Sequence, residues 1–327
     1  MASARTGDNR AVALLKERVR RVFREFPGAL AGDEEPVHQV RVAGRRLRVA
    51  LPLLADKARG RRIKRARRIL GDLTRAAGTG RDLDVLMALY EKRLAGPSAA
   101  SAEQREILRR LRVARNRSRS HLADGILDLD IDRLRHDIRR IRARGTADAD
   151  TILRRIRRIR EREGAVLLRG LTAVGGRYDP EALHALRRQV RRLRYTAEVD
   201  DEVRGQESGA SAVWKKLQDA IGVLHDVHVL GEWLDRLARR ASARGQRALA
   251  AAARTERAFF EDEGRRLHRE LLRKGPTEIV AEALGATAPG APKGPGSQRG
   301  STGSSSSPVT RSPYRAGPRA LSTPSAP

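Results

Sequence analysis

A histidine and several arginines follow one another at helical spacing in two separate segments of the sequence, and these side chains could bind an anion. The guanidinium group is a planar fork of donors that matches two phosphate oxygens, and it stays charged at physiological pH. A histidine among the arginines adds a donor whose charge can respond to a bound anion. The pattern therefore predicts a site for a phosphate-rich polyanion. The residues concerned are His38, Arg41, Arg45, Arg46 and Arg48 in the first segment and His184, Arg187, Arg191, Arg192 and Arg194 in the second.

Helical geometry would gather most of these side chains on one face of each helix. At about 100° per residue, the arginines of the first segment other than Arg46 fall in a narrow stripe beside His38, whereas apolar residues such as Leu47 fall on the opposite face. The second segment repeats this arrangement, with Arg192 at the flank of its stripe as Arg46 is at the flank of the first. We call these two sets of residues the arginine stripes. One face of each helix is expected to pack in a core while the other presents cations.

The arginine stripes belong to a longer repeat within the chain. Every residue of the first stripe recurs 146 residues later in the second, and a downstream group of five residues recurs 144 residues later in the same order. Two motifs that repeat in one order at nearly the same spacing indicate an internal duplication. We therefore expect two helical bundles related by a pseudo-twofold axis, the first over about 8–145 and the second over about 146–285. The downstream residues are Leu73, Gly78, Asp82, Val85 and Leu86, which match Leu217, Gly222, Asp226, Val229 and Leu230.

The pattern of apolar residues predicts an all-α fold. Apolar residues recur every three or four positions along most of the chain, and runs of β-branched or aromatic residues are rare. Asp82 and Asp226 each come shortly after a glycine, and we expect each of them to cap a new helix, because an aspartate at a helix start satisfies free backbone donors. The expected helices run over 12–26, 37–57, 63–77, 81–94, 102–121, 132–144, 150–173, 180–203, 212–221, 226–243 and 246–273.

The charge of the chain limits the choice of partner. Among 327 residues there are 69 Lys plus Arg against 40 Asp plus Glu, which gives a net charge of +29. Such a charge opposes folding by self-repulsion, and a polyanionic partner is the simplest physical reason to tolerate it. Inorganic polyphosphate, nucleic acid and an anionic membrane surface all qualify. The sequence contains no cysteine, which excludes disulfides, thiolate metal sites and cysteine nucleophiles.

The composition along the chain predicts the limits of its domain and its location in the cell. We expect one helical domain over 1–285 and a disordered tail over 286–327, because the tail is rich in Gly, Pro and Ser and has no apolar run to offset the entropy of ordering. No apolar stretch approaches the roughly 18 residues of a membrane span. The first twenty or so residues are charged throughout rather than built as a signal peptide. A cytoplasmic location is therefore expected.

Four segments carry a resemblance to a known family. The sequences VHQVRVAGRRLRVALPLL and ALHALRRQVRRLRYTAEV, followed by GRDLDVL and LHDVHVL, resemble the CHAD family, the conserved histidine α-helical domain. The resemblance extends over about 8–284 and implies two four-helix bundles around a basic cavity or pore that binds inorganic polyphosphate. It also implies recruitment to polyphosphate granules and places the arginine stripes on the basic surface. No alternating Glu-x-Glu-x-Lys strand of a CYTH domain, a frequent fusion partner in the family, occurs here, so a stand-alone binder is expected.

Three other readings compete with polyphosphate binding. Nucleic acid is the main alternative, and non-specific attraction to it is expected at this charge, but aromatic residues are only 3% of the chain, too few for the stacking platforms of single-strand binders. His225, Asp226 and His228 could in principle hold a metal ion, yet the matching first-half positions lack both imidazoles. No P-loop, nucleophile elbow or His-Glu-x-x-His motif occurs, so a metal-dependent phosphate-processing enzyme is the weakest reading. We expect a non-catalytic protein without a cofactor.

Overall fold

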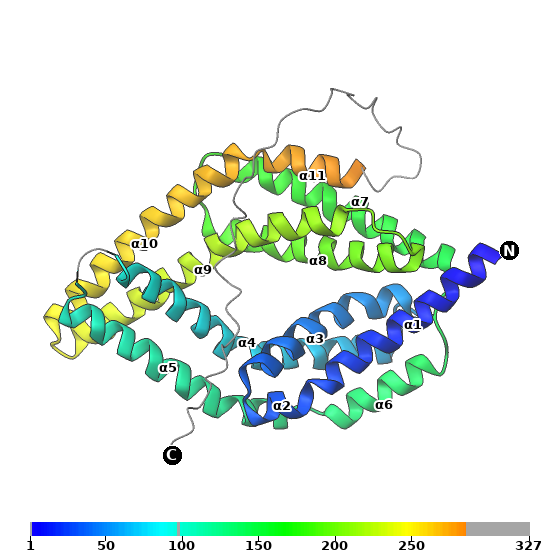
Figure 1. Ribbon diagram of the computed structural model, residues 1–327, viewed down its shortest axis with the longest axis horizontal. Helices are drawn as coiled ribbons and strands as arrows, with labels where there is room; N and C mark the ends of the chain where they lie inside the picture. Colours follow the sequence, from blue (N-terminus) through cyan, green and yellow to red (C-terminus); the bar gives the residue numbers. More distant parts are fainter. Residues whose placement is uncertain (1, 97–98, 286–327) are drawn as a thin grey trace, which may run out of the picture. The chain divides into compact units, whose positions relative to one another are not determined.

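The computed structural model describes residues 2–96 and 99–285, and the predicted tail over 286–327 lies outside this range. The described residues form α-helices joined by short connections and contain no strand, so the predicted all-α class is confirmed (Figure 1). The helices are α1 (Ala2–Arg24), α2 (Phe26–Ala31), α3 (Glu34–Leu54), α4 (Arg61–Leu94), α5 (Ala102–Leu127), α6 (Ile131–Arg142), α7 (Ala149–Val174), α8 (Pro180–Arg204), α9 (Ala210–Ala243), α10 (Arg247–Arg273) and α11 (Pro276–Gly285).

Polar side chains mark where several helices begin. Ser101 accepts a hydrogen bond from the backbone of Gln104, whose side chain accepts one from the backbone of Ser101, so α5 starts with a complete capping box. Asp148 and Asp179 accept hydrogen bonds from backbone N–H groups in the first turns of α7 and α8. Pro180 follows at the first position of α8, where its missing N–H costs nothing. These local signals explain why α7 and α8 begin close to where the sequence pattern predicts.

The helices α4 and α9 are each one continuous helix of 34 residues. The sequence pattern predicts two helices in each place, with Asp82 and Asp226 as caps, and this prediction is wrong because both aspartates lie inside a helix. Glycine and aspartate are weak helix formers, but tertiary packing overrides that preference in a long helix that is in contact along its length. Here α4 packs against α3, α5 and α6, and α9 packs against α8 and α10. The two aspartates therefore do not act as helix caps.

Three groups of buried apolar side chains form the core. The first joins α1 to α4 with the end of α5, α6, the start of α7 and the C-terminal part of α8, and the second joins α7, α8 and the first half of α9 with the end of α10 and α11. The third joins the C-terminal halves of α4 and α9 with α5 and α10 and includes Leu86, Tyr90, Leu111, Leu234 and Phe260. The first and third groups thus combine residues from both halves of the chain. The internal duplication itself stays a prediction, as do the limits of the two bundles.

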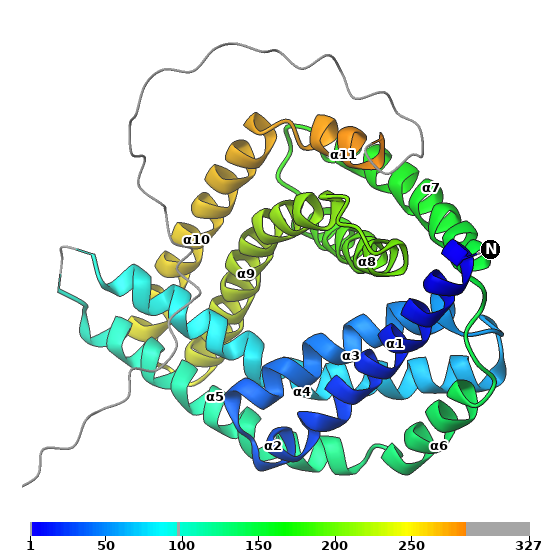
Figure 2. The same cartoon turned by 45° about the vertical axis from the view of Figure 1, so that its right-hand side comes forward.

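The two helices that carry the arginine stripes, α3 and α8, are in contact with each other. In both views α8 lies between α3 on one side and α7 with α11 on the other (Figures 1 and 2). The apolar faces of the stripe helices are buried, as the sequence predicts, with Leu47 fully buried on α3 and Leu193 on α8. The cationic faces of the two helices are therefore the surfaces left to line a site between them.

Candidate polyanion-binding site

Four arginines from the two stripes lie together between α3 and α8. We call Arg41 and Arg45 of α3 and Arg187 and Arg191 of α8 the central arginines. Burial, together with repulsion by Arg41 and Arg191, lowers the pKa of the Arg45 guanidinium to about 9. Burial, followed by repulsion from Arg187, lowers the pKa of Arg191 to about 10. The stripes, predicted separately from the sequence, thus bring their cations close enough to repel one another.

The side chains of Arg45 and Arg191 have no carboxylate partner among the described residues. Both are half-buried, and neither forms an ion pair or a side-chain hydrogen bond with another described residue. Many other arginines of the chain are paired, as Arg109 is with Glu106 at 2.6 Å. Desolvated cations without a counter-charge are costly, and the folded protein retains them here. An arrangement of this kind favours a bound anion, which would relieve both the desolvation and the repulsion.

The other two central arginines are held by the aspartates inside α4 and α9. Two nitrogens of Arg41 each donate to one carboxylate oxygen of Asp82 at 2.9 Å, and one of them also donates to the carbonyl of Gly78 at 3.1 Å. In the second half, Arg187 lies 3.8 Å from the carboxylate of Asp226. Asp82 and Asp226 are therefore ion-pair partners of the stripes, and this role replaces the predicted helix caps.

The repeated glycines lie beside these ion pairs. A Cβ placed at Gly78 would lie 3.8 Å from the Arg41 guanidinium carbon, and one at Gly222 would lie 3.9 Å from two nitrogens of Arg187. These are ordinary contact distances, so an alanine would fit at either position and the space beside the guanidinium does not require glycine. The repeated aspartate, by contrast, pairs with one central arginine in each half.

A cavity of about 890 Å³ opens beside Arg45 and Arg191, and we call it the arginine cavity. Ten arginines contribute to its lining, against one carboxylate, that of Glu161. Tyr195 is the one aromatic residue in the lining. A site so rich in guanidinium groups can bind several phosphate groups at once. The arginines of the lining are Arg45, Arg48, Arg59, Arg67, Arg155, Arg158, Arg162, Arg188, Arg191 and Arg192.

Several of these arginines were not among the residues that the repeat predicts. Arg67 lies on α4, Arg158 lies on α7 and Arg188 lies on α8, and none of them belongs to a stripe. They lack counterparts at the repeat spacing, so only the tertiary packing brings them to the cavity. Arg155 of α7 has a structural part as well, because it donates to the backbone carbonyls of Leu53 and Ala55 at 2.9 and 2.7 Å and so satisfies the end of α3.

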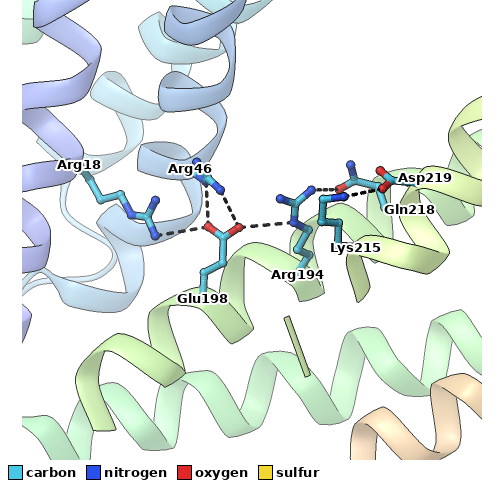
Figure 3. A network of polar contacts seen from close by, with 7 residues as sticks. All are labelled: Arg18, Arg46, Arg194, Glu198, Lys215, Gln218 and Asp219. Carbon is cyan, nitrogen blue, oxygen red and sulfur yellow. Dashed lines mark hydrogen bonds and ion pairs between the residues drawn. The ribbon is translucent and has the colours of Figure 1, made fainter. Parts of the chain in front are cut away.

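Two stripe residues, Arg46 and Arg194, form ion pairs with the carboxylate of Glu198 (Figure 3). Arg46 donates two hydrogen bonds to this carboxylate at 2.8 and 2.9 Å, and Arg18 of α1 and Arg194 lie 3.3 and 3.4 Å from it. Arg194 also donates to the side-chain carbonyl of Gln218, at 3.5 Å. Glu198 therefore joins α1 and α3 to α8 and holds three guanidinium groups within the protein.

The remaining stripe arginines, Arg192 and Arg48, differ in whether they form an ion pair with a carboxylate. Arg192 donates to Glu163 of α7 at 2.7 Å, although it also lines the arginine cavity. Arg48 lines the cavity beside Gly71, and its Nε is buried without a hydrogen-bond partner. Of the ten residues predicted from the sequence, Arg45, Arg48, Arg191 and Arg192 line the arginine cavity, and Arg41, Arg46, Arg187, Arg192 and Arg194 pair with carboxylates. Whether each of them contacts a ligand stays a prediction.

The histidines of the site lie at one end of the stripes. His38 is half-buried on α3. The Nδ1 atoms of His184 and His225 lie 3.1 Å apart, a contact in which one ring must accept and is therefore neutral there. Burial and the neighbouring arginines lower the pKa of both rings, that of His225 to about 3. No group of three or more His, Asp or Glu side chains in the described part of the chain is arranged to hold a metal ion.

The structure is thus an all-α domain in which the central arginines of α3 and α8 lie close together. Two of them, Arg45 and Arg191, have no carboxylate partner among the described residues. A family model of the CHAD domain matches residues 13–235, more than half of the chain, and the protein belongs to the CHAD family. Among solved structures, the crystal structure of the CHAD domain from the plant Ricinus communis matches with a TM-score of 0.59 and 21% identity, over 85% of this chain and 91% of that one. At 21% identity, this structural similarity shows the fold alone. No curated protein matches the sequence.

The described residues include no helix that is long and apolar enough to cross a membrane.

Proposed function

We propose that this CHAD protein binds inorganic polyphosphate in the arginine cavity. The observation that carries the proposal is the pair Arg45 and Arg191, two half-buried cations without a carboxylate partner among the described residues, at the edge of a cavity lined by ten arginines. A polyanion bound there would supply the missing counter-charge to both arginines at once. Each guanidinium offers paired donors to phosphate oxygens, and such charge-assisted hydrogen bonds are about twice as strong as neutral ones.

Polyphosphate suits this cavity better than nucleic acid does. Its phosphates follow one another without sugars and bases between them, so it presents charge at a density that matches closely spaced arginines. A nucleic acid would need room for its bases and surfaces on which to stack them. Tyr195 is the one aromatic residue of the lining, and its side chain is buried, which leaves no such surface there. Nucleic acid should therefore bind only through its backbone charge.

The binding is proposed to be non-catalytic and to need no cofactor. Hydrolysis or transfer of a phosphoryl group requires a positioned nucleophile and, in most enzymes, a metal held by carboxylates. The lining of the arginine cavity offers a single carboxylate, Glu161. We further propose that the bound polymer recruits the protein to polyphosphate granules in the cytoplasm.

A competition titration tests the proposal. Labelled protein is titrated with long-chain polyphosphate, random single-stranded DNA and heparin at one physiological salt concentration. We expect the dissociation constant for polyphosphate to be at least about tenfold lower than that for DNA, which corresponds to about 1.4 kcal/mol and needs only one or two additional charge-assisted contacts. Equal affinity for DNA would show that the protein behaves as a general polycation, and the proposal would be wrong.

A further inference from the structure

A second basic cavity lies on the other side of the loop that connects α3 to α4. It has a volume of about 390 Å³ and is formed by this loop, the start of α4 and α6, and we call it the loop cavity. Neither stripe contributes to it. Its basic lining residues are Lys57, Arg61, Arg62, Arg65, Arg133, Arg140 and Arg144, and Asp56 is its one acidic lining residue.

Most of the cations in the loop cavity lack a counter-charge. Arg65 is paired with the buried Asp137, at 2.5 and 2.6 Å. None of the other six forms an ion pair or a side-chain hydrogen bond with another described residue. Elsewhere on the described surface some exposed arginines pair with an acid one turn away, as Arg265 and Arg266 do with Glu261 and Glu263, and others are unpaired. The loop cavity differs in that six unpaired cations line one space, where they repel one another.

Helix ends explain only part of this charge. Arg140 lies in the last turn of α6, where a cation is favourable because the C-terminal end of a helix is partially negative. Arg61 and Arg62 are the first residues of α4, where the helix end is partially positive, and there is no acid in the first turn and no side-chain cap. Two cations at the positive end of a helix are unfavourable unless an anion lies beside them. An anion in the loop cavity would relieve that repulsion and neutralise the cations of α6 at the same time.

The loop between α3 and α4 separates this cavity from the arginine cavity. Ala58 and Arg59 line the arginine cavity, whereas their neighbours Lys57 and Gly60 line the loop cavity. The loop is fixed at its base, because Arg155 donates to the carbonyls of Ala55 and Asp56 at 2.7 and 2.9 Å. The two cavities therefore share this loop as a wall, since consecutive residues of it line one or the other.

We propose that the loop cavity is a second polyphosphate-binding site, which holds the continuation of a chain already bound in the arginine cavity. This inference rests on the proposed function. Two linked sites bind a ligand that spans them more tightly than either site alone, whereas a ligand too short to span them gains nothing. The protein accordingly selects long polyphosphate chains over short ones, and the loop cavity supplies that selectivity.

The test compares long-chain polyphosphate with tripolyphosphate on full-length variants. Arg61→Ala with Arg140→Ala removes one exposed cation from each helix of the loop cavity. The matched control is Arg244→Ala with Arg247→Ala, which removes two exposed, unpaired arginines at the turn between α9 and α10, away from both cavities. We expect the loop-cavity pair to weaken long-chain binding about tenfold and to leave tripolyphosphate binding within about twofold. The control pair should change neither, and all proteins should unfold at the same temperature.

Two outcomes would overturn the inference. The loop-cavity pair could weaken both ligands equally, or the control pair could cost as much long-chain affinity as the loop-cavity pair does. Failure of the proposed function has a different signature, because the wild-type protein would then bind long-chain polyphosphate no better than single-stranded DNA. A variant of the arginine cavity, Arg45→Ala with Arg191→Ala, should weaken both ligands and so separates the two sites.

Discussion

Replacing the central arginines Arg45 and Arg191 with methionine should stabilise the free protein while it weakens polyphosphate binding. Methionine keeps an unbranched apolar stem of similar reach, so the packing around the guanidinium stem is largely retained. The substitution removes a desolvated charge and the repulsion that it exerts on Arg41 and Arg187. Most single substitutions destabilise a protein, so a gain in stability would be a distinctive result.

The size of the gain follows from the pKa of Arg45. One pKa unit corresponds to 1.36 kcal/mol, so a guanidinium pKa of about 9 means that the folded protein destabilises the charge by several kcal/mol relative to water. Solvent in the open cavity screens part of this, and we expect a net gain on the order of 2 kcal/mol for Arg45→Met. For a chain of this size, that gain should raise the melting temperature by about 4 °C.

The assay measures thermal unfolding and polyphosphate affinity on the same variants. The loss of two phosphate contacts should weaken binding by at least about tenfold and reduce the slope of log affinity against log salt by about 1.4. Arg244→Met with Arg247→Met serves as the control of equal charge, and it should change the melting temperature and the affinity little. The reasoning is refuted if Arg45→Met lowers the melting temperature, because Arg45 would then have a stabilising partner, or if the control weakens binding as much.

Two further predictions concern the histidines and Glu198. Burial and the nearby arginines lower the pKa of His184 and His225, so the free protein should lose stability as the pH falls below the ordinary histidine range. Polyphosphate favours the imidazolium form of His184, so its affinity should rise as the pH falls from 8 toward 6. Titrations of His184→Ala should show a flatter pH dependence of affinity, and an unchanged slope would place the response elsewhere. Glu198→Gln should lower the free energy of unfolding in urea by about 3 kcal/mol, because Arg18 and Arg46 would lose their counter-charge, and an unchanged unfolding midpoint would contradict this role.

The sequence was sufficient to predict the all-α class and the residues that meet between α3 and α8. Helical periodicity is a local property, so the placement of Leu47 on one face and Arg45 on the other can be read from spacing alone. The repeat added the expectation that the two stripes serve one site, and their mutual repulsion in the structure agrees with it. The spacing could not show which stripe residues remain without a carboxylate partner, because the partners lie on other helices.

Three features of the site depended on tertiary packing. The pattern of a glycine shortly before an aspartate resembles a helix start, so Asp82 was expected to be a cap, whereas its carboxylate holds Arg41 from inside α4. Glu198 lies 152 residues from Arg46 in the sequence, and nothing local indicates that the two form an ion pair. Arg67 and the arginines of α7 reach the cavity from positions that do not belong to the repeat motifs. Each of these contacts joins elements whose relative placement only the folded chain determines.

The measurement that tests the central claim most directly is a crystal structure of the full-length protein bound to long-chain polyphosphate. We expect a continuous chain of phosphates in the arginine cavity, with phosphate oxygens within hydrogen-bond distance of the guanidinium groups of Arg45 and Arg191. Polyphosphate bound only on exposed arginines, with Arg45 and Arg191 still free of any anion, would contradict the assignment of the arginine cavity as the binding site.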